Sequence, residues 1–150
     1  MKTRWMILSL LAGAVTIMAG DIPGGPFAGT WKCNVAKSKF PGPPPQSESF
    51  TIDPGGKVTI SAVHADGTSS TWWYRPQAGK AVPVEGRGPN VTVTVRQVNS
   101  HRMEHTWSYD GRPAKSYSIL SEDGKTQTFH IEGTGKDGKP FEETLLYEKQ

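Results

Sequence analysis

Apolar and polar residues alternate with a period of two over most of the chain. In residues 101–109, for example, Met103 and Trp107 fall on one side and Arg102 and Glu104 on the other. The same alternation occupies residues 57–65, 90–98, 126–133 and 141–149. This period is typical of antiparallel strands with one buried face and one face toward water. No segment after residue 20 has the period of an amphipathic helix.

Turn residues separate these runs. Asp-Gly pairs stand at residues 66–67, 110–111, 123–124 and 137–138, and Asp-Gly favours tight hairpins because both residues tolerate a positive φ. The runs predict about ten strands, beginning near residues 29, 48, 57, 68, 80, 90, 101, 112, 125 and 139. Closure of a meander this long removes its exposed edges. The sequence therefore predicts an all-β fold, an antiparallel up-and-down meander that closes into a β-barrel.

A proline-rich segment, residues 38–47, breaks this rhythm between the first two predicted strands. Its four prolines, at positions 41, 43, 44 and 45, exclude a helix and favour an extended path. We expect a stiff connection across one end of the barrel. A motif that binds a partner is the alternative.

The first twenty residues have the layout of a secretory signal peptide. Lys2 and Arg4 give a basic start, residues 5–19 carry no charge, and the small residue Gly20 precedes Asp21. The apolar run is short for a membrane span. We therefore predict a cleaved leader over residues 1–20 and one domain over residues 21–150, secreted or periplasmic and free of the membrane after cleavage. An uncleaved N-terminal anchor is the alternative.

Charge and cysteine content exclude two further classes of protein. The chain has 17 basic and 14 acidic residues, a net charge of +3. Loss of Lys2 and Arg4 with the leader reduces this to +1, and no basic run remains to bind nucleic acid. Cys33 is the single cysteine, so no internal disulfide forms and the core alone must stabilise the fold. We expect the Cys33 side chain to pack as a small apolar group.

Catalytic motifs are absent from the sequence, which predicts a protein that is not an enzyme. There is no Gly-x-Ser-x-Gly stretch, and Cys33 has no activating neighbour. Glu142 and Glu143 are adjacent on a predicted strand, so they point to opposite faces and cannot act as one acid–base pair. Glu143 shares its face with Phe141 and Leu145, which places it along a cavity or near a rim.

Four histidines raise the question of a metal or haem site. His101 and His105 share one predicted strand face, but four residues of strand separate them by about 13 Å. That distance is too long for two ligands of one metal ion. His64 or His130 could approach from another strand, and haem needs only one axial histidine. We predict no cofactor and keep haem or metal binding as a weaker alternative.

Aromatic residues are the better candidates for a site. Trp72 and Tyr74 fall on one face of a predicted strand, whereas Trp73 and Arg75 fall on the other. Aromatic walls with a few polar groups are typical of cavities that bind small molecules. The same rings can also simply fill the barrel, and sequence does not decide between a hollow and a filled interior.

The stretch Gly29-Thr30-Trp31 at the head of the first predicted strand resembles the opening of the calycins, the lipocalins and fatty-acid-binding proteins. In these families Gly-x-Trp opens the first strand and the Trp closes one end of the barrel, which implies this role for Gly29 and Trp31. Residues 27–32 are especially similar to the fatty-acid-binding opening, and residues 145–150 resemble the last strand of that family.

Two departures from the fatty-acid-binding pattern limit what the resemblance implies. That family has a helix pair after its first strand, where this chain has the proline-rich segment. Its last strand has an Arg-x-Tyr pair that binds a carboxylate, where this chain has Leu145 and Tyr147. The resemblance therefore implies no carboxylate site. Residues 29–46 are also similar to a group of small exported bacterial lipocalin-like proteins without an assigned activity.

The leading hypothesis is a monomer that binds a small, mostly apolar molecule inside the barrel without catalysis. The predicted lining consists of inward-facing residues: Trp72, Tyr74, Met103, Trp107, Tyr109, Phe129 and Ile131, with His101, His105 and Tyr147 as polar contacts. Trp31 is assigned to barrel closure. The second hypothesis is a packed β-protein that binds a protein or glycan through a surface patch of Trp73, Arg75 and the proline-rich segment.

Overall fold

The computed structural model describes residues 20–150, so the predicted leader lies, apart from Gly20, outside the described residues. The strands are β1 (Gly29–Cys33), β2 (Ser47–Ile52), β3 (Val58–Val63), β4 (Ser69–Tyr74), β5 (Ala81–Pro83), β6 (Val91–Asn99), β7 (Arg102–Tyr109), β8 (Arg112–Leu120), β9 (Thr126–Thr134) and β10 (Pro140–Lys149). Two short 3-10 helices, η1 (Gly25–Phe27) and η2 (Val35–Lys37), flank β1. No helix in the described range is long and apolar enough to cross a membrane.

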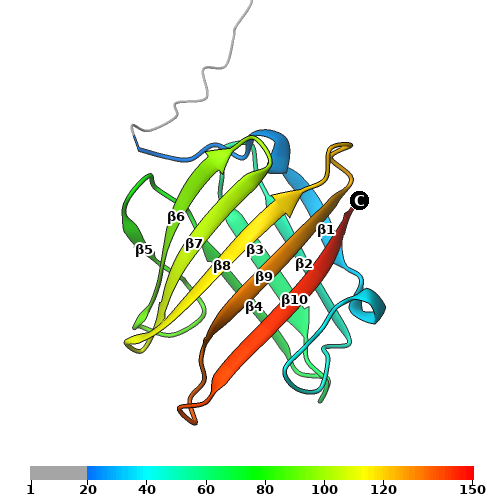
Figure 1. Ribbon diagram of the computed structural model, residues 1–150, viewed down its shortest axis with the longest axis vertical. Coiled ribbons are helices and arrows are strands. Elements are labelled where there is room, and N and C mark those ends of the chain that lie inside the picture. Colours follow the sequence, from blue (N-terminus) through cyan, green and yellow to red (C-terminus); the bar gives the residue numbers. More distant parts are fainter. Residues whose placement is uncertain (1–19) are drawn as a thin grey trace, which may run out of the picture.

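The strands form one antiparallel meander in the order β4-β3-β2-β1-β10-β9-β8-β7-β6-β5. Pairing of β1 with β10 joins the first and the last strand, and the sheet curls into a barrel (Figure 1). Two backbone hydrogen bonds between Trp73 and Glu85, with N···O distances of 3.0 and 2.9 Å, link β4 to the segment after β5. The predicted all-β barrel is confirmed, and every strand begins within one residue of its predicted start.

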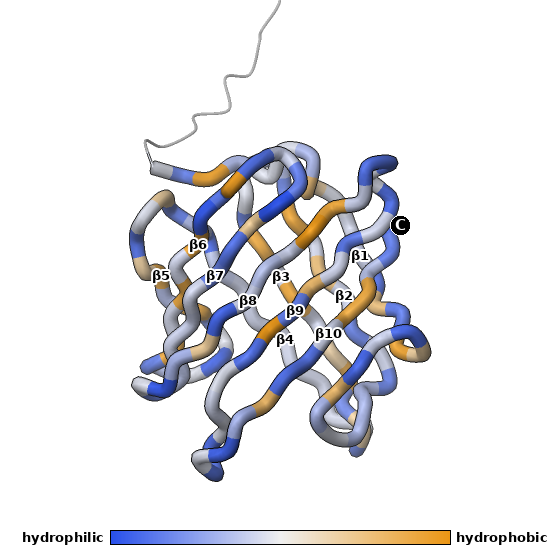
Figure 2. Tube along the Cα trace, viewed as in Figure 1, coloured by the Kyte–Doolittle hydropathy of each residue, from blue (hydrophilic) through white to orange (hydrophobic). Residues whose placement is uncertain are grey.

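The alternation in the sequence sets the two faces of the sheet. Along β4, Trp72 and Tyr74 are buried inside the barrel, whereas Trp73 lies outside with 39% of its surface exposed. Figure 2 shows apolar and polar residues alternating along the strands in this way. At the predicted turn between β7 and β8, Asp110 and Gly111 have φ angles of 52° and 82°, the conformation that a tight hairpin of this kind requires. Cys33 is buried among apolar side chains, as predicted.

Residues 20–28 cover one end of the barrel (Figure 1). The backbone N–H groups of Ile22 and Gly24 donate to the carbonyls of Pro76 and Pro54, both at 3.2 Å. Phe27 is fully buried, and its carbonyl accepts a hydrogen bond from Trp31 Nε1 at 3.0 Å. The N-terminal segment and Trp31 therefore close this end together, and we call it the capped end.

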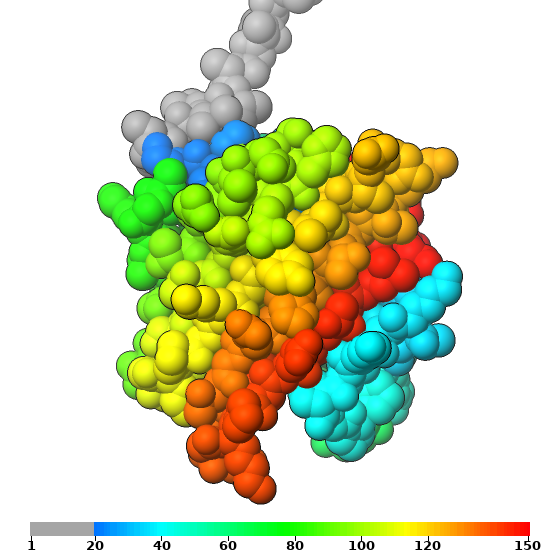
Figure 3. All heavy atoms as spheres, viewed as in Figure 1, coloured from blue at the N-terminus to red at the C-terminus, as the bar shows by residue number. Residues whose placement is uncertain are grey.

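The proline-rich segment lies at the opposite end and packs beside β10 (Figure 3, cyan beside red). Lys39 and Thr144 exchange two backbone hydrogen bonds, at 2.7 and 3.0 Å, so the segment continues the sheet where β1 has ended. Phe40 is half-buried against the core. The segment therefore serves as a connection between β1 and β2, and binding of a partner by it stays a prediction.

Candidate functional site

A cavity of about 360 Å³ occupies the inside of the barrel. Apolar residues of the N-terminal segment, Ile22 and Phe27, border it at the capped end. Arg87 and Lys136, which follow β5 and β9 in the turns of the other end, border it there. We call this second end the charged rim. The interior is therefore hollow, which sequence alone did not decide.

Nine of the ten predicted binding residues line this cavity: Trp72, Tyr74, Met103, His105, Trp107, Tyr109, Phe129, Ile131 and Tyr147. His101 does not, because β7 begins only at Arg102 and leaves His101 exposed in the preceding turn. There its Nδ1 lies 2.9 Å from Ser100 Oγ. Gly29 and Trp31 are outside the lining, and Trp31 is fully buried in the wall at the capped end.

Aromatic side chains form much of the cavity wall. Trp107 packs edge-on against Tyr74 with 5.7 Å between ring centroids and stacks on Tyr109 at 5.9 Å. His105 stacks on the other side of Trp107 at 6.0 Å. Trp107 Nε1 donates to Ser116 Oγ at 2.8 Å, which fixes the ring. The wall is thus largely aromatic and is shaped by side chains from β4, β7 and β8.

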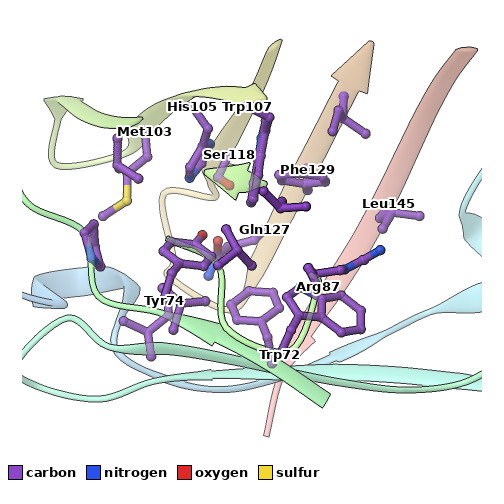
Figure 4. Close-up of a pocket in the computed structure, with 18 of the residues that line it drawn as sticks. Trp72, Tyr74, Arg87, Met103, His105, Trp107, Ser118, Gln127, Phe129 and Leu145 are labelled. Carbon is purple, nitrogen blue, oxygen red and sulfur yellow. The ribbon is translucent and has the colours of Figure 1, made fainter. Parts of the chain in front are cut away.

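Uncharged polar groups lie deep in the cavity, among them His105, Ser118 and Gln127 (Figure 4). His105 is 7% exposed and Gln127 is 2% exposed. Burial lowers the pKa of His105 to about 4, although a hydrogen bond to the Ser116 backbone acts in the opposite direction. The imidazole is therefore neutral near pH 7. No hydrogen-bond partner within residues 20–150 reaches His105 Nδ1 or Gln127 Nε2.

Two carboxylates border the cavity nearer the charged rim. Glu48 accepts a hydrogen bond from the Tyr147 hydroxyl. Burial raises the pKa of Glu143 to about 7; the charge of Glu48 adds to this shift and the charge of Arg87 opposes it. Burial also raises the pKa of Glu48, while the hydrogen bond from Tyr147 opposes that change. Glu143 therefore lines the cavity near its rim, as its position beside Phe141 and Leu145 predicted.

Basic side chains complete the rim. The Arg87 guanidinium lies over the Trp72 ring, 3.8 Å from its centroid. Arg112 also lines the cavity, and its Nη1 donates to the Thr134 carbonyl at 3.2 Å. Charge is thus concentrated at this end, where Arg87, Glu48 and Glu143 influence one another.

Sequence reasoning did not identify several of these polar residues. Gln127 lies two positions before Phe129 on β9, so the period of two could have placed it on the inner face. Ser118 lies on the inner face of β8 by the same rule. Arg87 follows β5 in a turn without a period, and no signal in the sequence pointed to it.

The four histidines, all within the described residues, lie in different places. His64 and His101 are exposed, His130 lies on the outer face of β9, and His105 faces the cavity. Among residues 20–150 no group of three His, Cys, Asp or Glu side chains could hold a metal ion. Haem binding through His105 stays an untested alternative.

The predicted surface patch is divided in the structure. Trp73 lies on the outer face of β4, with Lys57 Nζ 4.3 Å from its ring centroid. The proline-rich segment instead pairs with β10, and β3, β2 and β1 separate β4 from β10 in the sheet. The structure therefore does not bring Trp73 and the proline-rich segment together on one patch.

The chain folds as a ten-stranded antiparallel meander with a capped end and an internal cavity, which is the barrel architecture that the Gly-x-Trp resemblance implied. Its fold is similar to the crystal structure of the fluorescent protein UnaG, with a TM-score of 0.50 and 16% identity over 83% of this chain and 97% of that chain. The crystal structure of a single-substitution mutant of UnaG is similar to the same degree. Its TM-score is 0.50, with 18% identity over 82% of this chain and 95% of that chain. No protein-family model and no curated protein matches the sequence.

Proposed function

We propose that this protein binds a small, mostly apolar molecule non-covalently inside the barrel and performs no catalysis on it. The observation that carries the proposal is the internal cavity of about 360 Å³ with an aromatic wall. Sites for small molecules have volumes of about 300–1,000 Å³ and are lined mainly by apolar and aromatic groups with a few polar ones. Trp72, Tyr74, Trp107 and Phe129 supply this wall.

The shape of the cavity favours one route for the ligand. Residues 20–28 cover the capped end by backbone hydrogen bonds and by the buried Phe27 side chain. The charged rim is bordered by the long, solvent-exposed side chains of Arg87 and Lys136, and no segment of residues 20–150 covers it as residues 20–28 cover the capped end. We therefore expect exchange of the ligand through the charged rim.

The proposed setting is outside the cytoplasm, in the periplasm or the extracellular medium, and the protein acts as a monomer. The basic and apolar leader of residues 1–20 supports export. The mass of the mature chain from its own host tests this: export predicts loss of about the first 20 residues. A full-length chain in the cytoplasmic fraction would contradict it.

Native mass spectrometry of the mature protein from that exported fraction tests binding. We expect a reproducible small-molecule adduct that is lost on denaturation, and its mass would identify the ligand. A bare protein mass under gentle conditions would argue against a stored ligand and turn attention to the outer surface.

A matched pair of variants separates a cavity site from a surface site. Trp107→Ala removes an inner wall and should weaken binding at least tenfold, whereas Trp73→Ala removes an outward ring and should leave affinity unchanged. The reverse result would favour the surface hypothesis. Circular dichroism of both variants checks that the barrel remains folded.

A further inference from the structure

Two polar atoms deep in the cavity lack a hydrogen-bond partner within residues 20–150: His105 Nδ1 and Gln127 Nε2. Both side chains are more than nine-tenths buried, and both line the cavity. Buried polar groups are paired in the great majority of proteins, because an unpaired one costs stability. Two such groups in one cavity indicate that something absent from the free chain completes them.

The chemistry of the two atoms defines which group can bind both of them. Gln127 Nε2 is an amide nitrogen that carries two N–H donors, so its partner must accept a hydrogen bond. His105 is neutral near pH 7, and a neutral imidazole carries its one proton on either Nδ1 or Nε2. The unpaired Nδ1 of His105 therefore accepts or donates a hydrogen bond according to the tautomer that its partner favours, and a hydroxyl group suits either tautomer. A hydroxyl group can donate to one and accept from the other.

Among residues 20–150, no charged side chain that could bind an ion lies in the part of the cavity around His105 and Gln127. In Figure 4, His105, Ser118 and Gln127 point into the cavity with Tyr74 on the facing side. The charged side chains that line the described cavity belong instead to the charged rim or lie nearer to it: Arg87, Arg112, Lys136, Glu48 and Glu143. Gln127 is the second residue of β9, whereas Lys136 follows the last residue of that strand. An ion buried beside Gln127 would lose its hydration without a counter-charge.

We infer that the ligand is an apolar molecule with an uncharged hydroxyl group. The hydroxyl end enters the barrel first and binds His105 Nδ1 and Gln127 Nε2, and the apolar part of the ligand lies along the aromatic wall. This inference rests on the proposed function and names its ligand class. A ligand with an uncharged hydroxyl group distinguishes this cavity from a site for a carboxylate and from a site for an organic cation.

Four probes of equal chain length test the inference: decanol, decane, decanoate and decylamine. Their affinities are measured by tryptophan fluorescence titration of the mature protein. Decanol should bind about tenfold more tightly than decane, because two net hydrogen bonds each contribute a factor of a few. Decanoate and decylamine should bind more weakly than decanol at pH 7.

The variant Gln127→Leu should remove part of the preference for decanol over decane, by a factor of a few, while leaving the affinity for decane unchanged. Leucine has a similar volume and removes an unpaired buried donor, so we expect the variant to fold. Thr128→Val, the next residue and on the outer face of β9, is the matched control and should retain the preference for decanol. His105→Leu should likewise remove part of the preference for decanol over decane.

Each alternative result has a distinct meaning. Equal affinity for decanol and decane would overturn the inference and indicate that buried water satisfies the two atoms. Tightest binding of decanoate or decylamine would also overturn it, and would assign the site to the charged rim. If none of the four probes binds, the proposed function fails together with the inference.

Discussion

The hydroxyl group of Tyr147 on β10 donates a hydrogen bond to the carboxylate of Glu48 on β2, across the intervening strand β1. This contact joins residues 99 positions apart in the chain. Burial, together with the negative charge of Glu48, holds the pKa of Tyr147 well above its ordinary value, so the phenol remains a donor at any physiological pH.

We expect Tyr147→Phe to lower the free energy of unfolding by about 1.5–3 kcal/mol, the usual contribution of a hydrogen bond to a charged group. The substitution keeps the ring, which packs edge-on against Phe50 at 4.6 Å. Urea denaturation measures the loss. Tyr109→Phe is the control, because the Tyr109 hydroxyl makes no side-chain hydrogen bond within residues 20–150. Equal losses in both variants would show that the contact with Glu48 contributes nothing.

Two cavity residues have pKa values that affect stability in opposite directions. Glu143 titrates near pH 7 when folded, above its ordinary value of 4.5. The folded chain therefore keeps a proton that the unfolded chain loses, and stability falls as pH rises from 4.5 to 7. His105 titrates near pH 4 when folded, below its ordinary value of 6.5. The unfolded chain takes up the extra proton here, so stability rises between pH 4 and 6.5.

The two effects overlap, so we expect the free energy of unfolding to change little between pH 4.5 and 6.5. Glu143→Gln should expose the histidine effect, a rise of about 2–3 kcal/mol from pH 4 to 6.5. His105→Leu should expose a fall of similar size from pH 4.5 to 7, to which Glu48 adds in the same direction. Urea denaturation across this range measures both profiles.

Glu142→Gln is the control for this experiment, because Glu142 lies on the outer face of the same strand. It should keep the level profile of the natural chain. Profiles of identical shape in Glu143→Gln and in the natural chain would show that Glu143 does not titrate as its burial requires.

The period of two predicted which side chains enter the barrel, because a strand turns alternate residues to opposite faces. It placed Trp72 and Tyr74 inside and Trp73 outside, as the structure has them. It could not place Arg87, which lies in a turn where no period fixes the side chain. Nor could it pair Tyr147 with Glu48, since that contact depends on the curvature of the closed sheet rather than on neighbouring residues.

The cap, residues 20–28, approaches the backbone of Gly56 so closely that only a residue without a side chain fits there. Gly56 has a φ angle of +93°, and a Cβ atom added there would lie 1.8 Å from the Ile22 carbonyl oxygen. Gly56→Ala should therefore displace Ile22 and loosen residues 20–28, with a loss of about 1–3 kcal/mol in the free energy of unfolding. Hydrogen exchange should show faster exchange at the Ile22 and Gly24 amides.

The control for the cap is Gly124→Ala. Gly124 also has a positive φ angle, +70°, but no heavy atom lies within 4 Å of its added Cβ. It carries the backbone strain without the clash, so exchange at Ile22 should remain slow. Fast exchange at Ile22 in both variants would assign the effect to strain in the loops rather than to the contact with the cap.

The stacking of Arg87 on Trp72 places a cation at the charged rim of the cavity. Arg87→Ala should lower the free energy of unfolding by about 0.5–1 kcal/mol, as expected for a cation–π contact at an exposed site. It should also raise both the association and the dissociation rate of a cavity ligand, because the rim loses a side chain that obstructs it. Stopped-flow tryptophan fluorescence with decanol measures the two rates.

Lys57→Ala is the control, since Lys57 makes the same kind of contact with Trp73 on the outer face. Unchanged rates in Arg87→Ala, with the stability loss present, would show that the ligand does not pass Arg87 on its way to the cavity.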